Sequence, residues 1–192
     1  RNTCLSYLAE LNDPAIYNVC YEQFSQAKNM TDRIAALTIM SNHECVHREK
    51  ALEQFYNDWK LETGVIDKWF HIQALSPHKK TLERVKLLTK HEAFEITNPN
   101  KVYSLIRGFS TNHLVFNQQD GSGYRFLADQ IIKIDKINPQ VAARLCRAFD
   151  NWKKFDKKRQ DKALNELIRI RNTNGLSKDV TEISEKGLNF KN

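Results

Sequence analysis

Apolar residues recur along nearly the whole chain at intervals of three and four positions, the spacing that places them on one face of a helix. The first run comprises Leu5, Leu8 and Leu11, and similar runs follow towards the C-terminus. Alternation typical of a strand is confined to residues 94–96, a segment too short to build a sheet. The pattern therefore predicts an all-α protein.

Capping residues and prolines divide this pattern into about ten short helices. One helix-start signal, an N-cap side chain followed by a proline in the first turn, occurs three times, at Asp13-Pro14, Asn98-Pro99 and Asn138-Pro139. Gly64 occupies a position typical of the residue just past a helix C-terminus. Short helices joined by tight corners favour stacked antiparallel pairs, so we expect an α-solenoid-like superhelix.

A glycine-rich joint, Asp120-Gly121-Ser122-Gly123, separates the longest predicted loop, residues 110–119, from the next helix. Glycine allows the backbone a positive φ, and the Asp or Ser side chain can cap the helix that follows. Tyr124, Leu127 and Ile131 then recur at helical spacing. We expect a loop, a helix with one buried stripe, a sharp corner and a further helix from Asn138.

Composition places the chain among ordinary globular proteins. Its 192 residues are 41% hydrophobic and 28% charged, and no apolar run approaches the length of a membrane span. The four cysteines are scattered without a Cys-x-x-Cys pair, which is typical of reduced thiols: Cys4, Cys20, Cys45 and Cys146. We expect a cytoplasmic protein with no membrane partner.

The first residues suggest that the chain is an excised piece of a longer protein. Arg1 is not an initiating methionine, and the apolar pattern of a helix begins almost at once with Leu5. We therefore treat residues 1–192 as a single helical domain of a longer polypeptide.

Positive charge is concentrated in the last third of the chain. The net charge is +7, and residues 144–171 contain ten basic and four acidic side chains. Such a segment is most often a solvated helix face, and beyond Trp152 and Phe155 it lacks the interleaved aromatic residues of single-strand binders. A basic helical-repeat module for nucleic acid or protein is the alternative hypothesis for function.

His43-Glu44-Cys45-Val46-His47 fits H-E-x-x-H, the pattern that puts two zinc ligands on one helical face with a glutamate as general base. The third ligand of such peptidases is a downstream glutamate, and the corresponding position here is Ile66. Ser41 and Asn42 also predict a helix boundary at this point, where a shared face is not secure. We interpret His43, Glu44 and His47 as a chance match and predict no metal site in this chain.

Several segments together resemble the C-terminal domain of the bacterial aminopeptidase N family of zinc-dependent aminopeptidases. They occur in the order of the family, at residues 24–32, 67–77, 94–105, 155–160 and, most specifically, Asp120-Gly121-Ser122-Gly123-Tyr124 and Asn138-Pro139-Gln140-Val141-Ala142-Ala143-Arg144. The chain departs from the family before the Asp-Gly-Ser-Gly run, where Asn117 replaces a histidine.

The resemblance implies a non-catalytic domain that closes the active-site cavity of a zinc aminopeptidase. The catalytic domain of the same polypeptide would hold the zinc, so this chain alone is predicted to be inactive and to need no cofactor. Gln140 and Arg144 resemble the positions that face the cavity and contact the peptide substrate. One helical turn separates them, so both lie on one face, and a guanidinium can bind a carboxylate through two hydrogen bonds.

Overall fold

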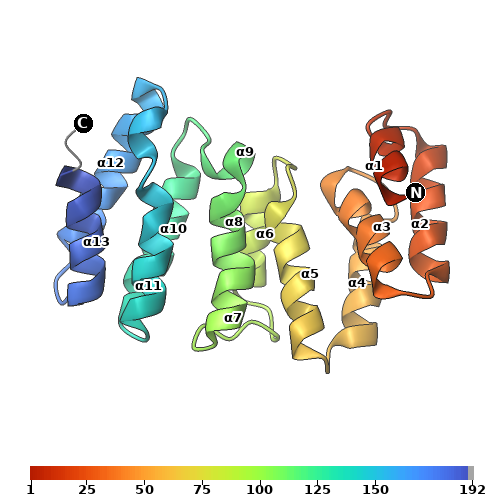
Figure 1. Ribbon diagram of the computed structural model, residues 1–192, viewed down its shortest axis with the longest axis horizontal. Coiled ribbons are helices and arrows are strands. Elements are labelled where there is room, and N and C mark those ends of the chain that lie inside the picture. Colours follow the sequence, from red (N-terminus) through yellow and green to blue (C-terminus); the bar gives the residue numbers. More distant parts are fainter. Residues whose placement is uncertain (190–192) are drawn as a thin grey trace.

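The protein is a row of helices that follow one another along its longest axis in sequence order, with the two termini at opposite ends (Figure 1). The computed structural model describes residues 1–189, and none of these residues forms a strand. The elements are α1 (Asn2–Ala9), α2 (Pro14–Gln26), α3 (Met30–Asn42), α4 (Arg48–Trp59), α5 (Thr63–Leu75), α6 (Thr81–Leu88), α7 (Pro99–Val102), η1 (Tyr103–Arg107), α8 (Gly108–Thr111), α9 (His113–Phe116), α10 (Ser122–Asp135), α11 (Pro139–Cys146), η2 (Arg147–Phe149), η3 (Trp152–Lys154), α12 (Lys157–Arg171) and α13 (Lys178–Asn189).

Helices adjacent in sequence pack side by side, and several also pack against the next but one. Helix α3 contacts both α4 and α5, α10 contacts α11 and α12, and α11 contacts α13. Each pair buries one face against its neighbour in the row, which is the packing of an α-solenoid. The predicted all-α, solenoid-like fold is confirmed. No helix among the described residues is long and apolar enough to cross a membrane.

Elements α7, η1 and α8 form one helical segment that runs from Pro99 to Thr111 without a break. It begins where the sequence predicts, because the Asn98 side chain accepts a hydrogen bond from the backbone N–H of Asn100 at 3.0 Å. Its middle turns, Tyr103–Arg107, are π-helical. A π segment of this kind is rare inside a helix and often marks a functional site.

The predicted loop at residues 110–119 is wrong in part, because α8 extends to Thr111 and α9 follows directly. Asn112 makes the corner between them, and its side-chain amide donates to the carbonyls of Ala74 and Ser76 at 3.1 and 2.8 Å. Its Oδ1 accepts from the backbone N–H of Val115 at 3.4 Å. Tertiary hydrogen bonds from a buried asparagine thus stabilise a short helix that local sequence does not reveal.

The glycine-rich joint has the predicted conformation. Gly121 has a φ of +71°, and the Asp120 carboxylate accepts from the backbone N–H of Ser122 at 3.0 Å. Gly123 packs so closely on the C-terminal end of α9 that a Cβ there would lie 2.3 Å from the carbonyl oxygen of Phe116. The prediction for Gly64 is wrong, because α4 ends earlier and Gly64 lies in the first turn of α5.

Candidate functional site

The H-E-x-x-H residues lie in the link between α3 and α4, which is not helical. His43 ends α3 in an extended conformation, and His47 is the N-cap of α4. The pattern requires a helix to bring two imidazoles onto one face, and that helix is absent here. The predicted helix boundary at this point is confirmed.

Each of these three side chains instead contacts a different partner. His43 Nε2 lies 3.6 Å from the Glu10 carboxylate, and His47 Nε2 lies 2.7 Å from Asn18 Oδ1 while its ring stacks on Tyr21. Glu44 accepts from His78 Nε2 at 2.7 Å, which lowers the pKa of the Glu44 carboxyl. No group of three or more potential metal ligands gathers anywhere in residues 1–189. The three residues do not fit a zinc site, and no step of chemistry follows from them.

Gln140 and Arg144 both lie on the exposed face of α11. Asn138 caps this helix, since its side chain accepts from the backbone N–H of Val141 at 3.2 Å. The opposite face is buried and consists of Val141, Ala142, Leu145 and Cys146. Helical periodicity therefore turns Gln140 and Arg144 outwards together, and they line the same depression of the surface.

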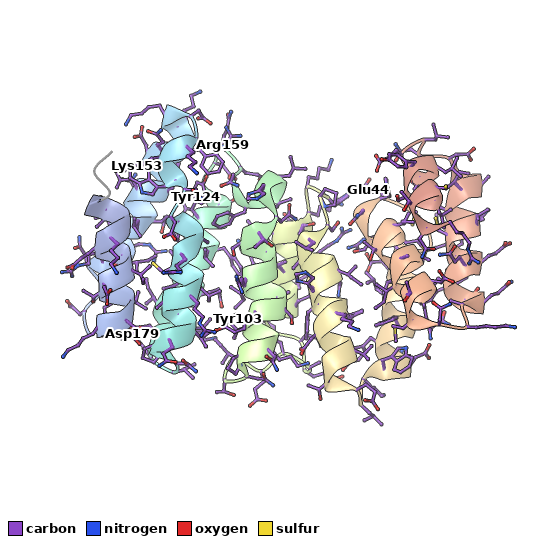
Figure 2. The ribbon with its side chains drawn as sticks, viewed as in Figure 1. Glu44, Tyr103, Tyr124, Lys153, Arg159 and Asp179 are labelled. Atoms are coloured by element: carbon purple, nitrogen blue, oxygen red, sulfur yellow. The ribbon has the colours of Figure 1, made fainter. Side chains whose placement is uncertain are left out.

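This depression, which we call the α11–α13 hollow, encloses about 290 Å³. It is lined by Gln140, Ala143, Arg144, Arg147, Asp179, Glu182 and Ile183. Asp179 and Glu182 come from α13, which packs directly against α11 (Figure 2). The hollow thus combines two guanidinium groups with two carboxylates, and the hydrogen bond from Lys186 lowers the pKa of the Glu182 carboxyl.

A second depression, the arginine hollow, lies on the other side of α11 and encloses about 490 Å³. It is lined by Arg107, Ser110, Thr111, His113, Arg144, Leu145, Arg147, Ala148 and Asn151. Arg144 and Arg147 border both hollows, while Arg107 comes from the π-helical segment. Within residues 1–189, no carboxylate lines the arginine hollow. Its chemistry suits an anionic group.

Tyr103 connects the π-helical segment to α11 (Figure 2). Arg144 Nη1 donates to the Tyr103 hydroxyl at 3.3 Å, and the Arg107 guanidinium lies 5.9 Å from the centre of the same ring. Sequence reasoning missed Tyr103, Arg107 and Arg147. Tyr103 and Arg107 are about forty positions from α11, and only the packing of the row brings them to Arg144.

Asp150 is the acidic residue that follows Arg147 most closely in sequence. Burial raises the pKa of its carboxyl, and the charge of Arg147 partly offsets that rise. No oxygen of Asp150 comes within 4.0 Å of the Arg147 guanidinium in the described structure, so the two do not form an ion pair. The guanidinium of Arg147 therefore stays available on the hollow side.

Ion pairs interrupt the basic segment 144–171. Lys157 pairs with Asp161 at 2.8 Å, and Arg169 pairs with Asp129 at 2.7 Å. Arg159 and Arg171 pair with Asp156 and Glu185. The segment is therefore not a continuous track of unpaired positive charge of the kind that follows a nucleic acid backbone.

Comparisons with known proteins agree over almost the whole chain. Residues 1–189 match the family described as "Domain of unknown function (DUF3458_C) ARM repeats". Aminopeptidase N of Haemophilus influenzae is 39% identical over 189 residues, and that of Caulobacter vibrioides is 41% identical over 191 residues. Each alignment covers 98% of this chain and 22% of the relative.

A solved structure agrees with both the sequence relationship and the fold. It is the crystal structure of Legionella pneumophila aminopeptidase A in complex with aspartic acid, with a TM-score of 0.92 and 39% sequence identity. The match covers 97% of this chain and 22% of that one, so the chain spans about a fifth of the length of these relatives. The chain belongs to the DUF3458_C family of ARM-repeat domains, and its resemblance to the C-terminal domain of aminopeptidase N is confirmed.

Proposed function

We propose that this chain is the non-catalytic C-terminal domain of a zinc-dependent aminopeptidase, where it closes the active-site cavity and contacts the peptide substrate. The observation that carries the proposal is the shared exposed face of Gln140 and Arg144 on α11, beside two polar hollows. The similarity to aminopeptidase N over the whole described chain supports it.

In this proposal Gln140 and Arg144 act on the part of the peptide that lies beyond the scissile bond. The Gln140 amide can both donate to and accept from a peptide backbone, and the Arg144 guanidinium can bind a carbonyl or a carboxylate. The hydrogen bond to Tyr103 holds Arg144 in place before substrate arrives. Peptide cleavage itself would belong to the catalytic domain of the same polypeptide, which would hold the zinc and supply the chemistry of hydrolysis.

Substitution Arg144→Ala in the full-length polypeptide tests this role. We expect kcat/KM for peptides of four or more residues to fall by roughly tenfold, because a charge-assisted hydrogen bond is lost. The value for a small aminoacyl-anilide, which does not extend to α11, should stay within about twofold. Arg125→Ala, which removes an exposed guanidinium from α10, is the matched control. Equal losses on both substrates would rule out the proposed contact.

The chain alone offers an independent test. Purified residues 1–192 should bind no stoichiometric zinc and should cleave no aminoacyl-anilide, because His43, Glu44 and His47 do not share a face. Equilibrium dialysis with zinc followed by metal analysis measures the first, and release of the chromophore measures the second. Robust activity that is abolished by His43→Ala would overturn the proposal in favour of an autonomous zinc hydrolase.

A further inference from the structure

Three of the eleven arginines in the sequence have no carboxylate within 4.0 Å in the described structure. These three are Arg107, Arg144 and Arg147, and all of them border the arginine hollow. The other eight each lie within that distance of an Asp or Glu side chain: Arg1, Arg33, Arg48, Arg84, Arg125, Arg159, Arg169 and Arg171. The unpaired guanidinium groups of the chain are therefore gathered in one place.

The cluster concentrates positive charge on one part of the surface, where Arg107, Arg144 and Arg147 are all exposed. Like charges gathered in this way create a positive potential that attracts an anion. None of the other polar side chains that line the hollow, Ser110, Thr111, His113 and Asn151, is acidic. Ser110 and Thr111 donate to the carbonyls of Arg107 and Gly108 at 2.8 Å. The hollow thus carries an excess of positive charge with donors available for a ligand.

The donors are held in place by the fold. The Tyr103 hydroxyl accepts a hydrogen bond from Arg144, and the Arg107 guanidinium lies near the Tyr103 ring. Arg147 begins η2, about one helical turn beyond Arg144, so the two side chains emerge from neighbouring positions of the same surface. Tyr103 thus contacts two of the three guanidinium groups, and each of the three matches a carboxylate in geometry because it can donate two parallel hydrogen bonds.

We propose that the arginine hollow binds a carboxylate group of a peptide, either an Asp or Glu side chain or the C-terminal carboxylate. The identity of the ligand as a peptide rests on the proposed function, whereas the preference for a carboxylate rests on the three guanidinium groups alone. An open depression of about 490 Å³ has room for a residue side chain or a chain end. The domain thereby favours peptides whose acidic group reaches the arginine hollow while their N-terminus lies in the active site.

Binding to the 192-residue chain itself tests the carboxylate preference. Three probes are titrated at low ionic strength and followed by NMR of arginine side chains: Ala-Ala-Asp amide, Ala-Ala-Asn amide and Ala-Ala-Asn with a free C-terminal carboxylate. We expect the acid-bearing peptides to bind at least about tenfold more tightly than Ala-Ala-Asn amide. Whichever acid-bearing probe binds more tightly identifies the side chain or the chain end as the source of the carboxylate.

The double variant Arg107→Gln/Arg147→Gln should abolish this preference, and Arg125→Gln should retain it. If the double variant does not fold, the same titrations are made with Arg107→Gln and Arg147→Gln separately, after a thermal unfolding curve has shown that each is folded. Equal binding of Ala-Ala-Asn amide and the acidic probes would overturn the proposal. Inorganic phosphate is the competitor, and tighter binding of phosphate than of any peptide would assign the hollow to free phosphate and overturn the peptide assignment.

A kinetic readout separates this proposal from the proposed function. In the full-length polypeptide, the ratio of kcat/KM for a peptide with Asp to that for the same peptide with Asn should fall by about tenfold in Arg107→Gln/Arg147→Gln. A failure of Arg144→Ala to affect peptide turnover would contradict the proposed function but leave the binding preference of the isolated chain intact. Loss of turnover that is equal for the two peptides would contradict the carboxylate preference.

Discussion

Arg144 donates a hydrogen bond to the hydroxyl of Tyr103, a residue 41 positions earlier in the chain, at 3.3 Å. The contact joins α11 to the π-helical segment, and Arg144 also borders the arginine hollow. An arginine side chain loses conformational entropy when a ligand orders it. Because Tyr103 already restrains Arg144 in the free protein, less entropy is lost when a ligand binds. Under the proposed function, Tyr103 is therefore a positioning residue for Arg144.

Tyr103→Phe should therefore weaken peptide binding without harming the fold. Loss of one partly exposed hydrogen bond changes the free energy of unfolding by about 1 kcal/mol or less. In the full-length polypeptide we expect KM for peptides to rise a few-fold while kcat for a small aminoacyl-anilide is unchanged. Urea unfolding and steady-state kinetics measure the two effects.

Tyr21→Phe is the matched control, because Tyr21 also makes a 3.3 Å hydrogen bond, to Gln54, at the other end of the row. It should reproduce any loss of stability but leave KM for peptides at the wild-type value. A rise in KM of the same size in both variants would argue that Tyr103 acts through general stability and not through Arg144.

The N-cap of α11 offers a second test of the same helix. Asn138→Ala removes the hydrogen bond to the backbone N–H of Val141 and should cost about 1 kcal/mol in the free energy of unfolding. Fraying of the first turn also displaces Gln140, so peptide KM should rise. Asp13 is an equivalent cap of α2, since its carboxylate accepts from the backbone N–H of Ala15 at 2.8 Å. Asp13→Ala should reduce the free energy of unfolding by a similar amount with no change in peptide KM.

The caps show how far local sequence predicts this fold. Asp13, Asn98, Asn138 and Asp156 all cap helices, since each side chain accepts from a backbone N–H in the first turn. These interactions span only two or three residues, so the sequence signal contains all the partners. The apolar periodicity likewise predicts the buried faces, including Trp69 and Phe70. Fold class and most helix starts follow from these short-range patterns.

The candidate site was less accessible from sequence. The pairing of Gln140 with Arg144 follows from their separation by one turn, but Arg107 enters the site through a π-helical segment that no local pattern predicts. Among the residues that the structure describes, no carboxylate lies within 4.0 Å of the Arg147 guanidinium, and this is a property of three-dimensional packing, since Asp150 is only three positions away in sequence. At Gly64 a local pattern predicts the wrong structure. Glycine is common just past a helix C-terminus and therefore predicts a helix end, but Gly64 lies in the first turn of α5.

Gly123→Ala should destabilise the protein strongly. The new Cβ would lie 2.3 Å from the carbonyl oxygen and 2.9 Å from the carbonyl carbon of Phe116, and backbone atoms cannot move aside as a flexible side chain can. Overpacking of this kind costs about 1–3 kcal/mol or more. Urea unfolding of the variant measures the loss.

Gly64→Ala is the natural comparison, since nothing lies within 4 Å of a Cβ at that position. Because Gly64 is in the first turn of α5, alanine should stabilise the helix, by up to about 1 kcal/mol. Opposite signs for the two glycine substitutions are expected. A neutral Gly123→Ala would show that the loop before α10 can shift away from the joint.

Cys146 predicts how stability depends on pH in the alkaline range. Burial, with a smaller contribution from the charge of Asp150, raises the pKa of its thiol from the ordinary value of 9.0 to about 12. Between these two values the unfolded chain loses the thiol proton while the folded protein keeps it. Stability from this group is therefore fully present below about pH 9 and is lost as pH rises towards 12, by about 1.4 kcal/mol per pH unit.

In Cys146→Ala, the part of the decrease in unfolding free energy with rising pH that comes from the thiol should vanish. The variant should be less stable at every pH, because a buried side chain is shortened. The measurement is the free energy of unfolding in urea at intervals from pH 8 to about pH 11, compared with wild type. Cys4→Ala, at an exposed cysteine, should keep the wild-type slope. Parallel curves for wild type and Cys146→Ala would mean that the thiol ionises as readily in the folded protein as in the unfolded chain, and that solvent reaches the buried side of α11.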